Sequence, residues 1–132
     1  IGFTNGCFDL FHLGHLNSFM EIKKYCDILV VAVNSDFSIK RYKGNDRPIQ
    51  DEKTRITLIS NLELVDYCLL LKEDTPLNII KAIKPDVIGK QGYTIDKWIE
   101  AQFVQSYGGK VITLKKVNGY STTNLINKIK GK

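Results

Sequence analysis

The sequence is poor in cysteine and lacks long hydrophobic runs. Its three cysteines, Cys7, Cys26 and Cys68, are odd in number and widely spaced. They form neither a disulfide framework nor a C-x-x-C metal pair, which favours reduced thiols in a cytoplasmic protein. The longest apolar run, Ile28 to Val33, is far shorter than the roughly 18 residues that a membrane-spanning helix needs. We therefore expect a cytoplasmic protein with no membrane contact.

Three common signatures are also absent. No G-x-G-x-x-G follows the first expected strand, no G-x-x-x-x-G-K-[ST] occurs, and there is no H-E-x-x-H. A dehydrogenase, a P-loop NTPase and a zinc protease therefore lose support. The chain starts at Ile1 rather than at methionine and shows no signal peptide. Whether upstream residues or a kinase domain belong to the protein is open at this point.

The formal net charge of +5 makes nucleic-acid binding one interpretation. Many lysines of the last quarter, however, fall partly on one expected helix face and partly on the tail. Aromatic residues are not interleaved with them, as a base-stacking surface requires. We therefore predict no nucleic-acid partner, and a basic pocket for a polyanionic small molecule is consistent with the charge.

Apolar, β-rich runs alternate with helical patterns, which indicates one domain, residues 1–132, with a parallel sheet covered on both faces. We predict a Rossmann-like, doubly wound α/β fold of about five strands that binds its ligand at the carboxyl ends of the strands. The polar stretch Lys40 to Lys53 is predicted to be an active-site loop. The expected strands are Ile1 to Thr4, Ile28 to Val33, Tyr67 to Leu71, Val87 to Ile88 and Lys110 to Thr113. The expected helices are His15 to Lys24, Glu52 to Asn61, Pro76 to Ile83, Asp96 to Tyr107 and Thr122 to Lys130.

The only two histidines of the chain follow the first expected strand. His12 and His15 stand at the start of an expected helix, with Gly14 between them. Helix N-termini present free N–H groups to anions, glycine lets a phosphate approach the backbone, and imidazoles donate hydrogen bonds to phosphate oxygens. Such a place suits nucleotidyl transfer, in which the substrate's own phosphate is the nucleophile and the protein positions it and stabilises charge. The alternatives are a helix cap with a surface histidine, and a metal pair that lacks a nearby third ligand.

This segment resembles the signature G-x-F-D-x-x-H-x-G-H of the HIGH-motif, cytidylyltransferase-like nucleotidyltransferases. All six specified positions match, at Gly6, Phe8, Asp9, His12, Gly14 and His15. A second segment, Gly119 to Thr123, resembles the family's G-x-S-T-T. There Ser121 is predicted to cap a helix whose free N–H groups and hydroxyls face the triphosphate, with a plain capped helix as the alternative.

Nearly the whole chain resembles the D-glycero-D-manno-heptose 1-phosphate adenylyltransferases, which make ADP-heptose for bacterial surface polysaccharide. The resemblance implies ATP as nucleotide, Mg²⁺ as cofactor and pyrophosphate as product, and it leads us to expect a homodimer. One departure is Lys90 to Thr94, where the family usually carries K-G-G-D-Y and this chain has Tyr93 in place of the acid. The matching segments are Thr4 to Asp9, Val31 to Asp36, Lys40 to Gly44, Arg47 to Ile49, Val65 to Tyr67, Glu73 to Pro76 and Gly119 to Asn124.

Residue type and place predict the individual roles. The expected catalytic residues are His12, His15, Lys43 and Arg55, the last two as cations that reach phosphate. Lys40 and Arg41 are further candidates, with solvated charge as the alternative. Asp9 is expected to orient the histidine helix or to help hold Mg²⁺, and Asp36 to do the same or to cap a turn. Trp98 is expected in the core or an interface. The predicted nucleotide-binding residues are Asn5, Gly6, Cys7, Phe8, Asp9, Gly14, Gly119, Tyr120, Ser121, Thr122 and Thr123; the predicted substrate-binding residues are Asp36, Lys90 and Gly92; no dedicated protein metal site is predicted.

The sequence therefore predicts an enzyme that joins a sugar phosphate, heptose 1-phosphate, to the AMP part of ATP. The alternative on the same fold is a cytidylyltransferase for glycerol 3-phosphate or a similar alcohol phosphate. That branch usually has an arginine shortly before G-x-S-T-T, and this chain has Lys115 to Asn118 there. The alternative of another class is a non-catalytic nucleotide-binding module, which would not need both histidines.

Overall fold

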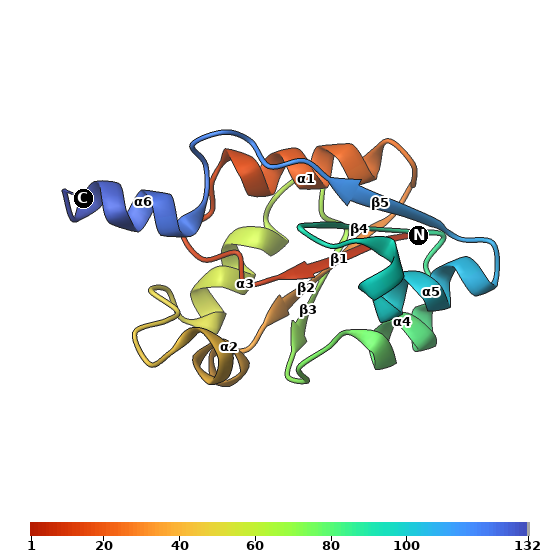
Figure 1. The fold of residues 1–132 in the computed structure, drawn as a ribbon, viewed down its shortest axis with the longest axis horizontal. Coiled ribbons are helices and arrows are strands. Elements are labelled where there is room, and N and C mark those ends of the chain that lie inside the picture. The colour runs from red at the N-terminus through yellow and green to blue at the C-terminus, as the bar shows by residue number, and fades with distance from the viewer. Residues whose placement is uncertain (132) are drawn as a thin grey trace.

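The structure, a computed structural model that describes residues 1–131, consists of helices arranged around one sheet (Figure 1). All five expected strands are present. The elements in chain order are β1 (Gly2–Gly6), α1 (Leu13–Lys23), β2 (Leu29–Asn34), α2 (Asp36–Lys43), α3 (Glu52–Ser60), β3 (Tyr67–Leu71), α4 (Leu77–Ile83), β4 (Val87–Gln91), η1 (Ile95–Lys97), α5 (Ile99–Ser106), β5 (Lys110–Leu114) and α6 (Thr122–Ile129).

The sheet is parallel throughout, with the strand order β3-β2-β1-β4-β5. The chain moves outward from β1 through β2 to β3, returns across the sheet to β4, and finishes the sheet at β5. This confirms the predicted doubly wound, Rossmann-like α/β fold. The strand order reverses between β1 and β4, and the carboxyl ends of these strands are therefore where such folds place their ligands.

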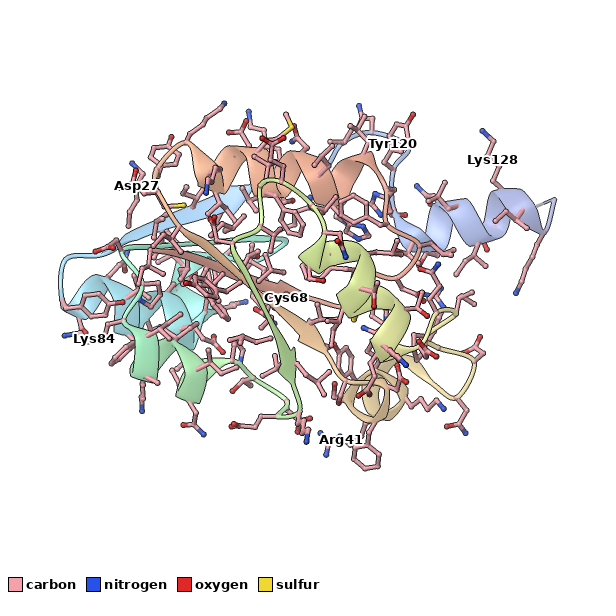
Figure 2. The ribbon with its side chains drawn as sticks, turned by 180° about the vertical axis from the view of Figure 1, so that it is seen from behind. Asp27, Arg41, Cys68, Lys84, Tyr120 and Lys128 are labelled. Atoms are coloured by element: carbon pink, nitrogen blue, oxygen red, sulfur yellow. The ribbon has the colours of Figure 1, made fainter. Side chains whose placement is uncertain are left out.

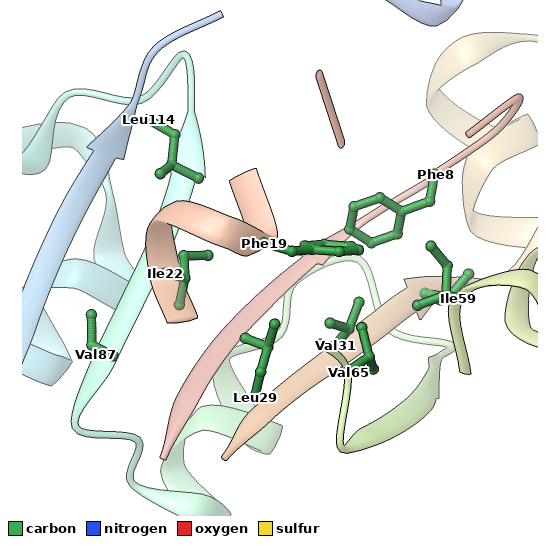
Figure 3. Packing of buried hydrophobic residues seen from close by; sticks show 10 residues of the cluster. Phe8, Phe19, Ile22, Leu29, Val31, Ile59, Val65, Val87 and Leu114 are labelled. Carbon is green, nitrogen blue, oxygen red and sulfur yellow. The ribbon is translucent and has the colours of Figure 1, made fainter. Parts of the chain in front are cut away.

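Alternate side chains of the central strands enter two hydrophobic clusters, one on each face of the sheet. In β2, Val31 and Val33 join Phe19 of α1 in one cluster (Figure 3), whereas Val30 and Ala32 belong to the other, with α4 and α5. Because both faces of the sheet are covered, the strand sequences are continuous apolar runs and do not alternate between apolar and polar residues.

The expected active-site loop is partly helical, so the prediction of an irregular segment from Lys40 onward is wrong at its start. The hydroxyl of Ser35 accepts a hydrogen bond from the backbone N of Ser38 at 3.2 Å and caps α2. Gly44, with a φ of 100°, ends this helix. The short helix packs inward mainly through Ile39, which is 1% exposed. One buried apolar residue in a polar stretch is too weak a periodic signal to predict a helix.

The expected helix Asp96 to Tyr107 is divided into η1 and α5. Trp98 lies between them with an extended backbone (φ −109°, ψ 98°), which interrupts the helical hydrogen bonding. Its side chain is 5% exposed and packs in the cluster beneath α5. Trp98 is therefore a core residue, which is one of the two places, core or interface, predicted for it.

Helix α6 extends away from the sheet, and none of its residues is fully buried (Figure 1). Lys128 projects from it into solvent (Figure 2), and Lys110, Lys115 and Lys130 are exposed as well. Much of the positive charge of the last quarter is thus solvated; Lys132 lies outside the described residues. Within residues 1–131 no helix combines the length and the apolar character that a bilayer crossing requires.

Candidate active site

A cavity of about 390 Å³ opens at the carboxyl ends of β1, β2, β4 and β5. Its other walls come from the loop after β1, the start of α1, the end of α2 and the segment that leads into α6. Tyr120 in that last segment lies beside the start of α1 (Figure 2). The predicted site residues that line the cavity are Asn5, Gly6, Cys7, Phe8, Asp9, His12, Gly14, His15, Lys43, Lys90, Tyr120, Ser121, Thr122 and Thr123.

His12 and His15 form a reciprocal cap at the start of α1. His12 Nδ1 accepts a hydrogen bond from the backbone N of Gly14 at 3.0 Å, and His15 Nδ1 accepts one from the backbone N of His12 at 3.2 Å. An imidazole whose Nδ1 accepts carries its proton on Nε2 when it is neutral. The two rings are stacked with their centroids 3.7 Å apart, so the cavity wall offers two adjacent Nε2–H donors.

Both imidazoles are neutral near pH 7. Burial lowers the pKa of His12; burial, followed by the charges of His12 and Lys43, lowers the pKa of His15 to about 3. Phe8 and Phe11 each place a ring centroid 5.4 Å from that of His15 and supply its apolar surroundings. Neutral donors of this kind suit stabilisation of charge on phosphate oxygens.

Gly14 is required by close packing between the two sequence motifs. A Cβ at this position would lie 2.8 Å from His12 Cε1 and 3.1 Å from the carbonyl oxygen of Tyr120. Any side chain would push the start of α1 away from the segment before α6. The glycine therefore lets the G-x-F-D-x-x-H-x-G-H and G-x-S-T-T segments meet at one site.

The hydroxyl of Thr122 forms a second link between the motifs, and its predicted role changes accordingly. It donates to the carbonyl oxygen of Asp9 at 2.6 Å, so it is not free to donate to a phosphate. Ser121 and Thr123 differ, because their hydroxyl oxygens act as acceptors. The Ser121 hydroxyl accepts from the backbone N of Asn124 at 3.0 Å, and the Thr123 hydroxyl accepts from the Arg47 side chain at 3.4 Å. Their own hydrogens stay available for a ligand. Ser121 caps α6, as predicted.

Asp9 is 4% exposed and organises the loop that precedes α3. Its carboxylate accepts hydrogen bonds from the backbone N of Ile49 at 2.7 Å and of Gln50 at 2.9 Å. The Gln50 side chain in turn accepts from the backbone N of Leu10 at 3.1 Å. These bonds tie the loop before α3 to the histidine segment, which fits the first of the two roles predicted for Asp9.

Arg55 does not line the cavity, so its predicted contact with phosphate is wrong. Its fully buried side chain donates to the carbonyl oxygens of Gln50 at 2.9 Å, Cys7 at 2.8 Å and Asn34 at 2.7 Å. It also donates to Asp36 Oδ1 at 2.7 Å. Asp36 is therefore engaged with the arginine and does not line the cavity either, contrary to its predicted substrate contact. The sequence does not show that this charged residue of α3 points inward.

Two predicted glycines also lie outside the cavity lining. Gly92 has a φ of 78° and Gly119 a φ of 80°, values that favour glycine. They shape the turns after β4 and before α6 instead of contacting a ligand, which corrects their assignment. Their neighbours Gln91 and Tyr120 line the cavity.

Four cations line the cavity: the predicted Lys43 and Lys90, and also Arg47 and Lys116. Arg47 falls within the predicted active-site loop but was not singled out there, and Lys116 was not predicted; both reach the cavity only once the loop before α3 and the segment after β5 fold over the sheet. Arg47 donates to the Thr123 hydroxyl across the cavity mouth at 3.4 Å. A concave surface with this much positive charge suits a polyphosphate.

Asn34, Tyr42 and Gln91 are further cavity residues that sequence reasoning misses. Asn34 and Gln91 end β2 and β4, and a polar residue at the carboxyl end of an apolar strand is a signal that could have identified them. Tyr42 falls within the predicted active-site loop, Lys40 to Lys53, at the end of α2, but no pattern singled it out from its neighbours.

The comparison with known proteins identifies the family. The family model described as "Cytidylyltransferase-like" matches residues 3–128. The chain belongs to this family. It is 52% identical over 132 residues to the "Bifunctional protein HldE" of Paramagnetospirillum magneticum, and 46% identical over 130 residues to that of Campylobacter fetus. These matches cover 99% and 98% of this chain but only 27% and 28% of the two relatives.

A solved structure supports the same family. The crystal structure of the lipopolysaccharide core biosynthesis protein from Thermoplasma volcanium GSS1 superposes on this cytidylyltransferase-like chain with a TM-score of 0.72. The two are 34% identical, and the match covers 89% of this chain and 97% of that one. The family and the fold together make this chain a domain of nucleotidyltransferase type.

Mg²⁺ is the expected cofactor of this cytidylyltransferase-like domain, but the part of the chain that the structure describes has no cluster of side chains that would enclose the ion. No three His, Cys, Asp or Glu residues of residues 1–131 gather where they could hold a metal ion. The carboxylate of Asp9 already accepts two backbone N–H groups. The donor set therefore does not fit an ion held by protein side chains alone. Mg²⁺ therefore stays a prediction; nucleotide phosphates commonly carry this ion into a protein site.

The departure from the family pattern lies at the cavity wall. Tyr93 lines the cavity, with its ring centroid 5.6 Å from that of Trp98 and 4.8 Å from Lys90 Nζ. An aromatic ring thus stands where the K-G-G-D-Y pattern expected from the resemblance to heptose 1-phosphate adenylyltransferases has an acid. The wall offers a neutral ring with a phenolic hydroxyl in place of a carboxylate.

Proposed function

We propose that this domain is an adenylyltransferase that joins heptose 1-phosphate to the AMP part of ATP and releases pyrophosphate. The observation that carries the proposal is the pair of Nε2–H donors on His12 and His15, at the start of α1, in a cavity lined by four cations. The choice of ATP and of a heptose is supported by the chain-wide resemblance to heptose 1-phosphate adenylyltransferases. Similarity to a protein of lipopolysaccharide core biosynthesis agrees with it.

In the proposed reaction a phosphate oxygen of the sugar phosphate attacks the α-phosphorus of ATP. A new P–O bond forms, the bond from the α-phosphorus to the bridging oxygen breaks, and pyrophosphate leaves with that electron pair. The nucleophile is already anionic, so no protein base is required. His12 and His15 donate hydrogen bonds to phosphate oxygens that gain charge. Lys43 and the N-terminus of α6 hold the triphosphate.

A substrate panel tests the proposal. ATP and CTP are each combined with both anomers of D-glycero-D-manno-heptose 1-phosphate and with glycerol 3-phosphate, and pyrophosphate release is measured at steady state. We expect the highest kcat/KM for ATP with a heptose 1-phosphate, or with a close relative whose hydroxyl pattern suits Tyr93. A clear preference for CTP with glycerol 3-phosphate would overturn the adenylyltransferase assignment. Nucleotide binding without pyrophosphate release from any pair would favour a non-catalytic module.

A further inference from the structure

Arg47 is the one arginine of the chain that has no carboxylate partner within residues 1–131. The other two arginines, Arg41 and Arg55, each form a salt bridge with an aspartate. Arg47 lines the cavity, and the only side-chain hydrogen bond that it forms within these residues goes to the Thr123 hydroxyl at 3.4 Å. A guanidinium has five N–H donors, and two of them in parallel match a phosphate group. Arg47 is therefore suited to an anionic ligand of the cavity.

The loop before α3 holds the backbone of Arg47 from both sides. The carboxylate of the buried Asp9 accepts from the backbone N of Ile49 and of Gln50, just after the arginine. Before it, the carbonyl oxygen of Gly44 accepts from the backbone N of Arg47 at 3.3 Å. The arginine is thus placed at the cavity independently of a ligand. A group that is positioned in advance loses less conformational freedom when it binds.

The segment that leads into α6 runs from the histidine pair to Arg47. A Cβ on Gly14 would lie 2.8 Å from His12 Cε1 and 3.1 Å from the carbonyl oxygen of Tyr120, so Tyr120 lies beside the histidine. Three residues further on, Thr123 contacts Arg47. In the proposed reaction the histidines bind oxygens at the α-phosphate, and the start of α6 holds the triphosphate. The β- and γ-phosphates then extend along this segment toward Arg47.

We infer that Arg47 binds the β- and γ-phosphates of ATP, together with the start of α6, and stabilises the charge that the departing pyrophosphate gains. The inference rests on the proposed function and names the residue that holds its leaving group. No bond to Arg47 forms or breaks, because the guanidinium only donates hydrogen bonds. As the bond from the α-phosphorus to the bridging oxygen breaks, the pyrophosphate takes the electron pair and these hydrogen bonds strengthen.

The test uses inorganic pyrophosphate alone as the probe and measures its affinity by calorimetry. Arg47→Ala should bind it roughly tenfold more weakly than the wild-type protein, because a hydrogen bond between charged groups is lost. Arg47→Lys keeps the charge but not the fork of donors, and we expect an affinity between those of the other two proteins. The control is Lys72→Ala, at an exposed position outside the cavity lining, and it should match the wild-type protein.

Two further measurements separate the pyrophosphate from the groups next to it. AMP carries only the α-phosphate, and its affinity should change less than about twofold in Arg47→Ala. In steady-state pyrophosphate release from ATP and heptose 1-phosphate, kcat of Arg47→Ala should fall at least about tenfold, because charge on the leaving group is no longer stabilised. The KM for heptose 1-phosphate should change less than about twofold.

The inference is overturned if Arg47→Ala, shown to be folded by circular dichroism, binds pyrophosphate as tightly as the wild-type protein does. An equal loss of AMP affinity also overturns it, since Arg47 would then contact the α-phosphate. So does a raised KM for heptose 1-phosphate with unchanged pyrophosphate affinity, since Arg47 would then contact the acceptor. If Arg47→Ala does not fold, unchanged pyrophosphate affinity in Arg47→Lys overturns the inference.

Failure of the proposed function has a different signature. In that case the wild-type protein releases no pyrophosphate from ATP with any sugar phosphate. Calorimetry with inorganic pyrophosphate needs no acceptor, so weaker binding by Arg47→Ala would still support the assignment of Arg47 to the pyrophosphate.

Discussion

His12 and His15 each use one ring nitrogen for the helix and leave the other for a ligand. Their Nδ1 atoms cap α1, and the resulting tautomer places both Nε2–H groups at the cavity. The helix-cap interpretation and the active-site interpretation are therefore compatible, since the same hydrogen bonds serve both. The cap orients the donors before any substrate arrives, which is what preorganised charge stabilisation requires.

Removal of either imidazole should reduce turnover strongly while the protein stays folded. For His12→Ala and His15→Ala we expect kcat to fall roughly 10²–10³-fold, the typical effect of losing one preorganised donor to a transition-state oxygen. Steady-state pyrophosphate release measures the change, and circular dichroism reports on folding. A folded variant with near wild-type turnover would contradict the assigned role.

Stability should fall as the pH is lowered below about 6.5. Burial lowers the pKa of His15 to about 3 from its ordinary value of 6.5, so between these values the unfolded state binds more protons. The contribution of His15 is therefore complete above pH 6.5 and is lost progressively toward pH 3, by up to about 2 kcal/mol at pH 5.

The matched variant for this prediction is His15→Gln. Glutamine at this third helical position can still accept from the backbone N of His12, as in a capping box, but it does not titrate. Urea denaturation at pH 7 and pH 5 should show a smaller loss of stability for His15→Gln than for the wild-type protein. Parallel losses in both proteins would show that His15 does not carry the pH dependence.

At the scale of elements, Arg55 of α3 connects segments that form the cavity. Its guanidinium reaches the ends of β1 and β2 through two carbonyl oxygens, the loop before α3 through a third, and α2 through Asp36. Arg55 is thus a positioning residue, which acts on the site through the strand ends that it holds. It is the largest of the fully buried side chains.

Replacement of Arg55 should lower the free energy of unfolding more than replacement of any surface charge of the same helix. Arg55→Met leaves three carbonyl oxygens and the Asp36 carboxylate without their partner, and we expect a loss of roughly 3–5 kcal/mol. Lys53→Met, at an exposed position of α3, is the control and should change stability by less than about 0.5 kcal/mol. Urea denaturation checks both values. A loss below about 1 kcal/mol for Arg55→Met would contradict the positioning role.

At the scale of the whole molecule, the cavity joins segments from both ends of the chain. The Asp9 carbonyl accepts from Thr122 across a sequence separation of 113 residues, and Gly14 packs against the Tyr120 carbonyl. A nucleotide bound in this cavity, as we propose, would contact the loops after β1 and β5 together. Its binding should therefore stabilise the entire fold rather than one segment.

ATP should raise the melting temperature in a way that depends on Lys43. At a free ATP concentration of 100 times the Kd, one-site binding adds about 2.7 kcal/mol to the stability. Lys43→Ala removes a cation from the cavity wall, and we expect a roughly tenfold weaker ATP affinity and a smaller thermal shift. Lys72→Ala, at an exposed position after β3, is the control and should retain the wild-type shift. Equal shifts in all three proteins would contradict the placement of the triphosphate.

The secondary-structure elements and the candidate site differ in how much of each the local sequence predicts. Continuous apolar runs such as Leu29 to Val33 predict the strands and the parallel sheet, because burial on both faces leaves no polar alternation. The histidine segment predicts the phosphate site, because a helix start with glycine and two imidazoles is a local feature. α2 does not follow in the same way, since its single buried apolar side chain, Ile39, makes no recognisable period.

The sequence by itself thus determined the fold class, the family resemblance and the position of the histidine pair, since each depends on neighbours in the chain. The tertiary structure alone decided which charged and polar side chains face the cavity. Arg55 turned inward to bond three carbonyl oxygens, whereas Arg47 and Lys116 turned toward the cavity. All three residues are basic, and the direction of each side chain depends on packing between segments that lie far apart in the sequence.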